Sequence, residues 1–492
     1  MQDGTLLAAV DLGSNSFRLE IGRYEHGHIQ RVEYLKETVR QGGGLDEERN
    51  LSQAAMQRGW DCLARFAERL ADFAPRQVRA VATQTLREAK NRDVFLERGN
   101  AILGHAIEVV SGPEEARLIY QGVSHLLPQS DERRLVVDIG GRSTELILGR
   151  QYQAHEVASF RVGSVSWSKQ FFADGQLTAA AFRQAETAAQ AMLDEALAVY
   201  RPERWERAYG SSGTVGAVAE ILAACGHESG VIYRQGLDWL LQQLLRAGHT
   251  SRVELSGLKD DRRPVIGGGL SVLRALFDLL QIDRLHVAQG ALRQGALYDL
   301  IDRSSPGTDK RSATVAGLAQ RFAVDGAQVE RVARAAGTLF AQATPQAGDD
   351  AARELGWAAQ LHEIGQRIAH SGYHRHGAYI LEHTDAAGFA QPELQRLGQL
   401  LLRAHRGKLR KLDLDWDRPG LALQLACLRL AVALCHARRD PDLQGLRLQQ
   451  QGQRLSLWLP AGWAERYPQS AHLLREEGLD WQRTPWVLEI FE

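Results

Sequence analysis

The amino-acid sequence predicts an α/β fold with an internal duplication, followed by an all-helical domain and a small C-terminal α+β segment. Over residues 1–303, short apolar strands alternate with amphipathic helices, which is typical of α/β architectures. One phrase in this region occurs twice, as "AAVDLGSNSFRLEIGR" and as "RLVVDIGGRSTELILGR". After the linker-like stretch "SSPGTDKRS", most of the chain to about residue 440 has a helical pattern. We therefore expect four segments, at residues 1–128, 129–303, 304–440 and 441–492.

The individual elements follow from the spacing of apolar residues. "LLAAVDLG" and "LVVDIG" are β-rich runs, and "FRLEIGRYEHGHIQRVEYLKETVR" predicts two strands joined by a turn at His26 and Gly27. "SQAAMQRGWDCLARFAERLADF" predicts a helix, because its large apolar residues are three or four positions apart. Near the C-terminus, "LRLQQQGQRLSLWLP" alternates like a hairpin, and "WVLEIFE" predicts a closing strand.

The overall composition argues against several classes of protein. The chain has 492 residues and a net charge of -1, so its charge gives no reason to expect a nucleic-acid or membrane partner. No apolar run approaches the length of a transmembrane helix, and the N-terminus lacks the basic start of a signal peptide. The four cysteines form no CxxC pair, so nothing indicates disulfides or zinc. We expect a cytoplasmic protein.

The two copies of the repeated phrase align residue by residue. Val10–Gly22 can be laid over Val137–Gly149, and each copy reads as a strand, an Asp-x-Gly-x-x-Ser turn and a second strand. Such a turn offers backbone N–H groups and a hydroxyl to an anion, and glycine lets the backbone approach phosphate closely. Two copies that face each other across a cleft would grip a phosphate, whereas the alternative is two ordinary hairpins with turn-forming residues. The aligned pairs are Asp11 with Asp138, Gly13 with Gly140, Ser16 with Ser143 and Gly22 with Gly149.

These motifs resemble those of known phosphate-handling proteins. "VDLGSNSFRL" and "VDIGGRSTELILG" look like the two phosphate motifs of the actin, Hsp70 and sugar-kinase superfamily, which implies two ribonuclease H-like subdomains around a cleft. Together with "ATQTLREAKN", "VVSGPEEARLIYQGV", "GSSGTVGAVAE" and "GALRQGALYD", they resemble the exopolyphosphatase / guanosine pentaphosphate phosphohydrolase family. "LGWAAQLHEIGQRIAHSGYHRHGAYIL" resembles the C-terminal helical domain of its long members, which is similar to HD-type metal phosphohydrolases.

The motif "SGPEEARL" predicts the start of a helix and a candidate general base. Ser111 is expected at the N-cap, and Glu114 takes the capping-box position three residues later, which leaves Glu115 free for another role. Hydrolysis of a phosphoanhydride needs an in-line water and a group that accepts its proton. The helix dipole keeps a first-turn carboxylate ionised, and the resemblance matches Glu115 to the catalytic base. The alternative is an acid that merely favours a helix start.

The resemblance also implies the residues that bind metal and phosphate. Asp138 and Glu145 match acids near a magnesium ion, and Asp11 is the corresponding acid of the first copy. Mg²⁺ prefers one or two carboxylates together with phosphate oxygens and water, and a monovalent cation such as K⁺ is a further candidate. Arg87 matches an arginine that would bind phosphate through its fork of donors, with a surface helix arginine as the alternative. The expected phosphate-binding residues are Asp11, Gly13, Ser14, Asn15, Ser16, Arg87, Gly140, Gly141, Arg142, Ser143, Thr144, Gly210, Ser212, Gly213 and Thr214.

Two stretches depart from the family pattern. Arg142 stands where the phosphate motif usually has a third glycine, and its long cationic side chain either contacts a polyanion or points to solvent. Gln289 and Gln294 stand where relatives often have acids. We therefore leave both glutamines out of the predicted site.

The predicted helical domain is rich in histidine but has no clear metal site. The diagnostic His-Asp pair of HD proteins reads His362-Glu363 here, and no complete set of metal ligands is evident. We expect a domain without metal chemistry that binds a long polyanion, with a solvated helix face as the alternative. The candidate polyanion path comprises His374, Arg375, His376, His405, Arg406, Lys408 and Arg410.

The preferred interpretation of the whole chain is an exopolyphosphatase. It would release terminal phosphate from inorganic polyphosphate processively, by Mg²⁺-assisted attack of a water activated by Glu115. The first alternative keeps this machinery and removes the 5′ γ-phosphate of guanosine pentaphosphate. A kinase of the same superfamily would need an acceptor pocket with an Asp base, and a non-enzymatic polyphosphate or nucleotide sensor would not need the intact Glu115. By resemblance, we also expect a homodimer.

Overall fold

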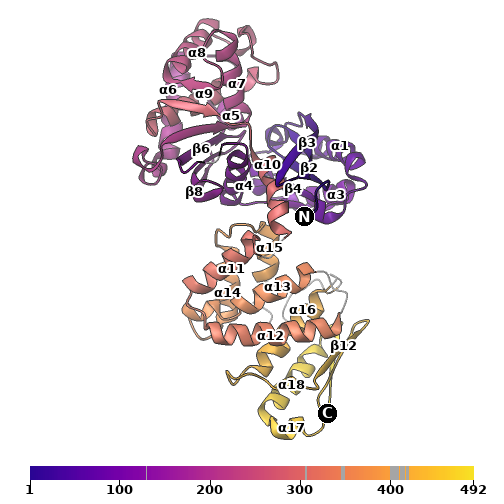
Figure 1. Ribbon diagram of the computed structural model, residues 1–492. Helices are drawn as coiled ribbons and strands as arrows, with labels where there is room; N and C mark the ends of the chain where they lie inside the picture. Colours follow the sequence, from indigo (N-terminus) through magenta and orange to yellow (C-terminus); the bar gives the residue numbers. More distant parts are fainter. Residues whose placement is uncertain (129, 305–306, 345–348, 399–408, 410–415, 417–419) are drawn as a thin grey trace. The chain divides into compact units, whose positions relative to one another are not determined.

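The computed structural model divides the chain into two compact units, Met1–Thr308 and Asp309–Glu492. It describes the whole chain except residues 129, 305–306, 345–348, 399–408, 410–415 and 417–419 (Figure 1). Among the residues described, no helix has the length and the apolar character needed to cross a membrane.

The first lobe of the N-terminal unit is built on a five-stranded sheet in the order β3-β2-β1-β4-β5. β1, β2 and β3 pair in antiparallel fashion, and β4 and β5 run parallel to β1. The predicted turn at His26 and Gly27 joins β2 to β3, and the predicted long helix is α1. The elements are β1 (Leu6–Leu12), β2 (Phe17–Glu25), β3 (His28–Glu37), η1 (Gln41–Gly44), α1 (Gln53–Leu70), β4 (Val78–Ala82), α2 (Gln84–Glu88), α3 (Arg92–Leu103), β5 (Ile107–Val109) and α4 (Gly112–His125).

The second lobe is built on a six-stranded sheet in the order β10-β11-β9-β6-β7-β8. β6, β7 and β8 form an antiparallel meander, β9 and β11 run parallel to β6, and β10 adds an antiparallel edge. The elements are β6 (Arg133–Ile139), β7 (Thr144–Arg150), β8 (Gln153–Phe160), α5 (Ser164–Phe171), α6 (Ala179–Leu193), β9 (Arg207–Ser211), α7 (Ser212–Ala224), β10 (Val231–Tyr233), α8 (Arg234–Ala247), α9 (Ile266–Leu279), β11 (Arg284–Val287) and α10 (Leu292–Arg303).

The two sheets confirm the duplication that the repeated phrase predicts. The order β3-β2-β1-β4-β5 recurs as β8-β7-β6-β9-β11 with the same strand directions, and each copy of the phrase forms the first hairpin of its sheet. The aligned glycines also occupy the same irregularity. Strand pairing shifts register between Ile21 and Gly22 in one lobe and between Leu148 and Gly149 in the other. The predicted fold class of two ribonuclease H-like subdomains is therefore confirmed.

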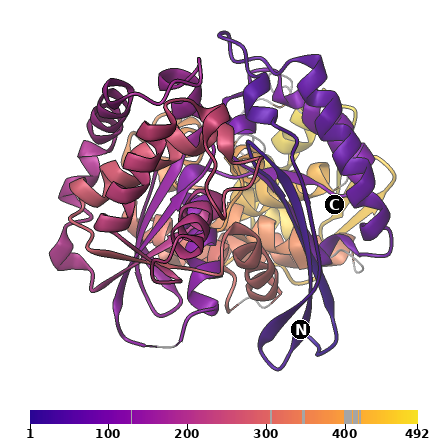
Figure 2. The same cartoon turned by 90° about the horizontal axis from the view of Figure 1, so that it is seen from above.

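Two helices of this unit pack on the sheet of the opposite lobe. α4 follows the first sheet in sequence but contacts β7 and β8, whereas α10 follows the second sheet and contacts β1 and β4. The two helices also contact each other and lie between the two sheets, which Figure 2 shows from above. Their backbones approach closely because a Cβ on Gly295 would overlap the carbonyl oxygen of Leu118, and one on Gly122 would overlap that of Ala291. α4 thus precedes the second sheet in sequence but packs on it, and α10 packs on the first sheet.

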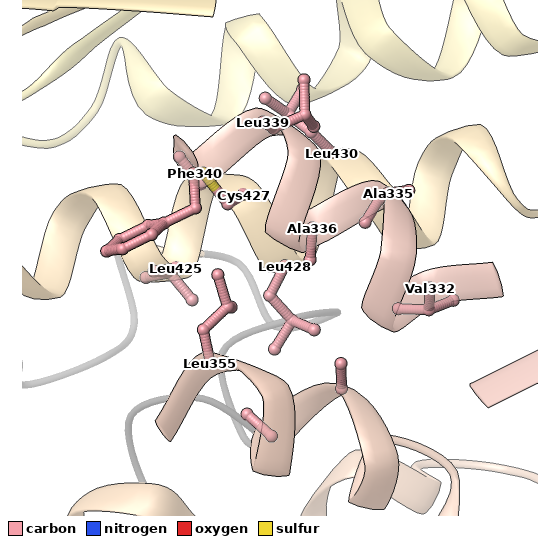
Figure 3. Close-up of a cluster of buried hydrophobic side chains, with 14 of the residues drawn as sticks. Val332, Ala335, Ala336, Leu339, Phe340, Leu355, Leu425, Cys427, Leu428 and Leu430 are labelled. Atoms are coloured by element: carbon pink, nitrogen blue, oxygen red, sulfur yellow. The ribbon is translucent and has the colours of Figure 1, made fainter. Parts of the chain in front are cut away.

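The C-terminal unit combines helices with a three-stranded sheet around a single apolar cluster. The cluster includes Val332 and Phe340 of α12, Leu355 of α13 and Leu428 of α16 (Figure 3). It continues into the sheet through leucines of its three strands. The predicted hairpin is β12 and β13, and the predicted closing strand is β14, which runs parallel to β13. The elements are α11 (Lys310–Arg321), α12 (Gly326–Ala343), α13 (Asp349–Leu361), α14 (Tyr373–Glu382), α15 (Gln391–Arg396), α16 (Leu421–Leu434), β12 (Arg447–Gln451), β13 (Arg454–Trp458), α17 (Trp463–Arg466), α18 (Pro468–Trp481) and β14 (Val487–Phe491).

Candidate active site

A cleft in the N-terminal unit brings together both copies of the repeated phrase and the start of α4. The turn between β1 and β2, the turn between β6 and β7, and the N-terminus of α7 all line it. Most of the residues predicted for the site therefore share one cavity. Those that line it are Asp11, Gly13, Ser14, Asn15, Ser16, Glu115, Asp138, Gly140, Gly141, Ser143, Ser212, Gly213 and Thr214.

The two duplicated turns are shaped for close approach of an anion. A Cβ on Gly13 would lie 3.0 Å from the carbonyl oxygen of Ser16, so the tight turn favours glycine. The equivalent Gly140 donates its N–H to the carbonyl of Ser143 at 2.9 Å. Within the part of the chain that the structure describes, Asn15 Nδ2 and Ser16 Oγ are buried and have no hydrogen-bond partner. Because buried donors are normally paired, these two groups are available to a bound ligand.

The third glycine-rich turn, between β9 and α7, borders the same cleft. Ser212 has a φ of +93°, a left-handed conformation that costs energy for a residue with a side chain. Its Oγ accepts a hydrogen bond from the N–H of Thr214 at 3.2 Å, and the start of α7 is a position that favours anions. Gly210 does not line the cleft. A Cβ there would lie 2.7 Å from side-chain atoms of Leu285 and Val215, so this glycine is required for packing.

Glu115 is buried at the start of α4 and lines the cleft. Ser111 caps the helix as predicted, because its hydroxyl accepts the N–H of Glu114 at 3.2 Å. The carboxylate of Glu114 pairs with Arg117, whose Nε lies 2.8 Å from Oε2, so the two adjacent acids have different roles. Arg87 Nη1 donates to Oε2 of Glu115 at 2.7 Å. Burial raises the pKa of Glu115, and the charge and hydrogen bond of Arg87 oppose this shift.

Two of the predicted metal ligands, Asp138 and Asp11, also line the cleft but differ in their surroundings. Burial, with a contribution from the negative charge of Glu115, raises the pKa of Asp138 to about 7. Asp11 lies between two arginines, with Oδ2 at 3.2 Å from Nη1 of Arg18 and 3.5 Å from Nη1 of Arg293. The charge of Asp11 is therefore already balanced, whereas that of Asp138 is not favoured without a cation.

Glu145, the third predicted metal ligand, is buried and does not line the cleft. Its Oε1 accepts a hydrogen bond from the hydroxyl of Ser159 at 2.8 Å, and burial with the negative charges of Glu115 and Asp138 raises its pKa. Over the described residues, no group of three His, Cys, Asp or Glu side chains forms a metal-binding cluster. Since Mg²⁺ needs only one or two carboxylates beside phosphate oxygens and water, Asp138 is the residue that fits such an ion.

Three arginines that the sequence analysis did not include also line the cleft: Arg18, Arg262 and Arg293. Arg18 is opposite Asp11 in the β1–β2 hairpin, so the register of the repeated phrase would have located it. Arg293 belongs to the quoted motif "GALRQG", in which only the glutamines were considered. Arg262 comes from a loop without a motif, and its guanidinium packs where Gly213 has no side chain. Burial and the positive charge of Arg18 lower the pKa of Arg262. The three guanidinium groups bring a set of N–H donors to this side of the cleft, where Asp11, Glu20 and Asp261 balance their charge.

Three other predicted phosphate-binding residues lie beside the cleft without lining it. The hydroxyl of Thr144 donates to the carbonyl of Val162 at 2.6 Å in the buried start of β7. Arg87 does not line the cleft and bonds to Glu115, which does. Arg142 crosses to the first lobe, where its Nη2 lies 2.6 Å from Oε2 of Glu88. These three side chains bond to other protein groups, and their predicted binding of phosphate stays a prediction.

The predicted polyanion path falls on two parts of the helical domain. His374, Arg375 and His376 lie at the start of α14, where the arginine is exposed and the histidines are half-buried. His405, Arg406, Lys408 and Arg410 lie outside the described residues. The path therefore stays a prediction.

The His-Glu pair of the helical domain is engaged in contacts within the protein. His362 is buried, and its Nδ1 lies 2.6 Å from the carbonyl oxygen of Ala359. Glu363 accepts a hydrogen bond from Nη2 of Arg438 at 2.7 Å. These contacts give the pair a structural role in the fold of this unit.

Comparison with known families and proteins identifies relatives along the whole chain. The model of the Ppx/GppA phosphatase family matches residues 21–304, and that of Ppx/GppA phosphatase domain III matches residues 310–478. A guanosine-5′-triphosphate,3′-diphosphate pyrophosphatase of Vibrio parahaemolyticus is 41% identical over 99% of this chain and 98% of the relative. The protein of the same name from Vibrio vulnificus is 40% identical with the same coverage.

Solved structures share the fold of the N-terminal unit. An exopolyphosphatase from Cytophaga hutchinsonii has a TM-score of 0.56 and 23% identity, and covers 61% of this chain and 98% of its own. The PPX-GPPA enzyme of Aquifex aeolicus has a TM-score of 0.51 and 25% identity, and covers 60% of this chain and 98% of its own. From the family models, which match most of the chain, and from the full-length relatives, it follows that the chain belongs to the Ppx/GppA phosphatase family and is a phosphoanhydride hydrolase.

Proposed function

We propose that the chain removes the 5′ γ-phosphate of guanosine pentaphosphate, that is, guanosine 5′-triphosphate 3′-diphosphate. The observation that carries this proposal is the full-length similarity, at 40–41% identity, to relatives named for that substrate. Exopolyphosphatase, the preferred interpretation of the sequence, shares its phosphate motifs with this activity, so the motifs do not discriminate between the two. We therefore favour the alternative over the first interpretation.

The arginine-lined side of the cleft supports a substrate with a second group of phosphates. Arg18, Arg262 and Arg293 lie outside the three phosphate-binding turns and line the cleft with their N–H donors. Asp11 pairs with Arg18 and Arg293, Glu20 with Arg293, and Asp261 with Arg262. Planar guanidinium groups bind phosphate through paired N–H donors. A 3′-diphosphate could accept hydrogen bonds from these guanidinium groups. The half-exposed ring of Tyr34, 5.2 Å below the guanidinium of Arg293, offers an apolar surface beside it.

The proposed reaction transfers the γ-phosphoryl group to water. Glu115 accepts the proton of the attacking water, the bond between the γ-phosphorus and the bridging oxygen breaks, and orthophosphate and guanosine tetraphosphate leave. The duplicated turns and the N-terminus of α7 hold the equatorial oxygens with backbone N–H groups and with the free donors of Asn15 and Ser16. Asp138 would hold a Mg²⁺ ion, which would neutralise part of the charge on the phosphate groups.

The direct test is phosphate release from guanosine pentaphosphate and from long-chain polyphosphate, measured side by side with the same preparation of the full chain. We expect a higher kcat/KM for guanosine pentaphosphate. A clear preference for polyphosphate would return the assignment to exopolyphosphatase.

Replacing Arg262 by Ala is expected to lower kcat/KM for guanosine pentaphosphate by about tenfold to a hundredfold, the size of one lost charge-assisted contact. GTP is the matched control substrate, because it has the same 5′-triphosphate and lacks the 3′-diphosphate. Hydrolysis of GTP should change little in this variant, as measured by steady-state phosphate release. An equal loss with both substrates would mean that Arg262 supports the turn at Gly213, on which it packs, rather than the 3′-diphosphate.

Replacing Asp138 by Asn is expected to raise the Mg²⁺ concentration for half-maximal activity by about tenfold or more, because an ion at this place loses its anionic ligand. The measurement is a Mg²⁺ titration of the initial rate at saturating substrate. Glu145→Gln is the comparison variant, since Glu145 does not line the cleft and its loss should shift the titration less. An unchanged titration in Asp138→Asn would place the ion elsewhere.

A further inference from the structure

A continuous chain of hydrogen bonds leads from the phosphate turn of the second lobe to the candidate base. Arg142 donates from Nη2 and Nε to Oε2 of Glu88, at 2.6 and 3.2 Å. Oε1 of Glu88 accepts from Nε2 of Gln84 at 2.7 Å, and Oε1 of Gln84 accepts from Nη2 and Nε of Arg87 at 2.6 and 3.0 Å. Arg87 then donates from Nη1 to Glu115 at 2.7 Å. We call these five side chains the Arg142 relay.

Each hydrogen bond of the Arg142 relay joins a donor to an acceptor. The charged groups on either side of Gln84 fix the orientation of its amide. The amide of Gln84 must present its nitrogen to the carboxylate of Glu88 and its oxygen to the guanidinium of Arg87. Gln84 is buried, and the side chains of Glu88 and Arg87 are only 12% and 10% exposed, so water competes little. Although burial opposes it, the hydrogen bonds from Gln84 and Arg142 lower the pKa of Glu88, which keeps it an anion.

The relay also spans the two lobes. Arg142 belongs to the turn between β6 and β7, whereas Glu88 ends α2 of the first lobe, and Nη1 of Arg142 lies 3.3 Å from the carbonyl oxygen of Gly42 in η1. The two phosphate turns meet at the same place, because a Cβ on Gly141 would lie 3.2 Å from Cβ of Ser14. Separating the turns would therefore stretch the bond between Arg142 and Glu88.

At the other end, the relay fixes the guanidinium that holds the base. Arg87 is anchored on one edge by Gln84 and on another by the carbonyl of Val110, at 2.9 Å from Nη1. With its plane fixed in this way, it engages one carboxylate oxygen of Glu115, Oε2, and leaves Oε1 for the attacking water. Small displacements of a catalytic group reduce its effect strongly.

We propose that Arg142 is a positioning residue, which couples the closed arrangement of the two phosphate turns to the orientation of Glu115. It does so without touching the substrate, since it does not line the cleft. This inference rests on the proposed role of Glu115 as the general base. It gives a function to the side chain that stands where the phosphate motif usually has a third glycine.

The test compares kcat and KM of relay variants with those of a matched control. Arg142→Gly and Gln84→Leu should each lower kcat about tenfold or more and change KM less than about twofold. Arg142→Lys should recover most of the rate, because a lysine can still pair with Glu88. The control is Lys36→Met, since Lys36 Nζ lies 2.9 Å from Oδ2 of Asp261 and also joins the two lobes, but outside the relay. Its kcat should stay within about twofold of the parent.

The double variant Arg142→Gly/Gln84→Leu separates the relay from independent effects. If both residues act through one path, the double variant should lose no more than Gln84→Leu alone, whereas multiplied losses would overturn the proposal. A raised KM with unchanged kcat in Arg142→Gly would also overturn it, because Arg142 would then bind the substrate. An equal loss of kcat in Lys36→Met would overturn it as well, because the rate would then depend on ion pairs between the lobes in general.

The same comparison stays valid if the proposed substrate is wrong. The relay acts on the base and not on the leaving group, so the expected ratios hold with polyphosphate if that is what the parent cleaves. If Gln84→Leu fails to fold, as judged by circular dichroism, Glu88→Gln is the replacement variant. It removes the negative charge between Arg142 and Gln84 and keeps a side chain of nearly the same shape. A Glu88→Gln variant with the full parental kcat would overturn the proposal.

Discussion

Replacing Glu115 by Gln is expected to lower kcat by at least about a hundredfold, the range for loss of a general base. The amide has nearly the same shape as the carboxylate but cannot accept the proton of the attacking water. The pKa of Glu115 is raised by burial, so the ionised form depends on Arg87, whose bond to Oε2 an amide oxygen can still accept. The phosphate turns are unaffected, and substrate binding should persist.

The measurement combines single-turnover hydrolysis with calorimetric binding of guanosine pentaphosphate. A variant that binds the substrate normally but turns it over slowly would support Glu115 as the base. Near-parental turnover would place the base elsewhere. Ser124→Ala, on the far part of the same helix, is the control, because its buried hydroxyl donates to the carbonyl of Gln121 within α4.

Replacing Asp299 by Ala is expected to lower the free energy of unfolding by about 3–5 kcal/mol, the cost of breaking a buried ion pair from one side. Asp299 on α10 accepts hydrogen bonds from Arg79 of β4, Arg117 of α4 and Arg303, the last at 2.7 Å from Nε to Oδ2. Arg79 is 1% exposed, and burial with the nearby charge of Arg303 lowers its pKa to about 10. Without the carboxylate, the three guanidinium groups would lose the acid that contacts all of them, and Glu108 and Glu114 would have to balance their charge.

Urea unfolding monitored by tryptophan fluorescence measures this loss. Glu220→Ala is the control, because Glu220 pairs with Lys259 at 2.8 Å in an exposed position, where ion pairs contribute about 0–1 kcal/mol. A loss below about 1 kcal/mol in Asp299→Ala would show that Glu108 and Glu114, the other acids near Arg79, hold the network by themselves.

The local parts of the fold and site could be predicted because they depend on neighbours in the sequence. A strand, a tight turn and a second strand are specified within some fifteen residues, so the duplicated hairpins and their aligned glycines were visible as a repeat. The start of α4 could be predicted for the same reason: Ser111 caps the helix, and Glu115 lies in its first turn and lines the cleft. Arg18 was within reach of the same reasoning, since the hairpin register places it opposite Asp11.

The features that escaped prediction depend on contacts between distant segments. Arg262 reaches the cleft only because its loop packs on the turn of Gly213. Glu145 follows the phosphate turn closely in sequence, yet it bonds to Ser159 of β8 instead of lining the cleft. The substrate could not be predicted for a different reason: the motifs indicate phosphate chemistry that both candidate activities share.

The exchange of α4 and α10 between the two sheets has a consequence for how the chain is synthesised. The first sheet leaves the ribosome early, but the helix that covers one of its faces, α10, comes last in the N-terminal unit. Until residues 292–303 emerge, Leu7 and Ala9 of β1 lack the side chains of Ala296, Leu297 and Leu300 that bury them. The nascent first lobe therefore exposes apolar surface for most of the translation of the second, and contacts of such high sequence separation form slowly. Each lobe therefore needs a helix from the other part of the sequence to bury its apolar surface completely.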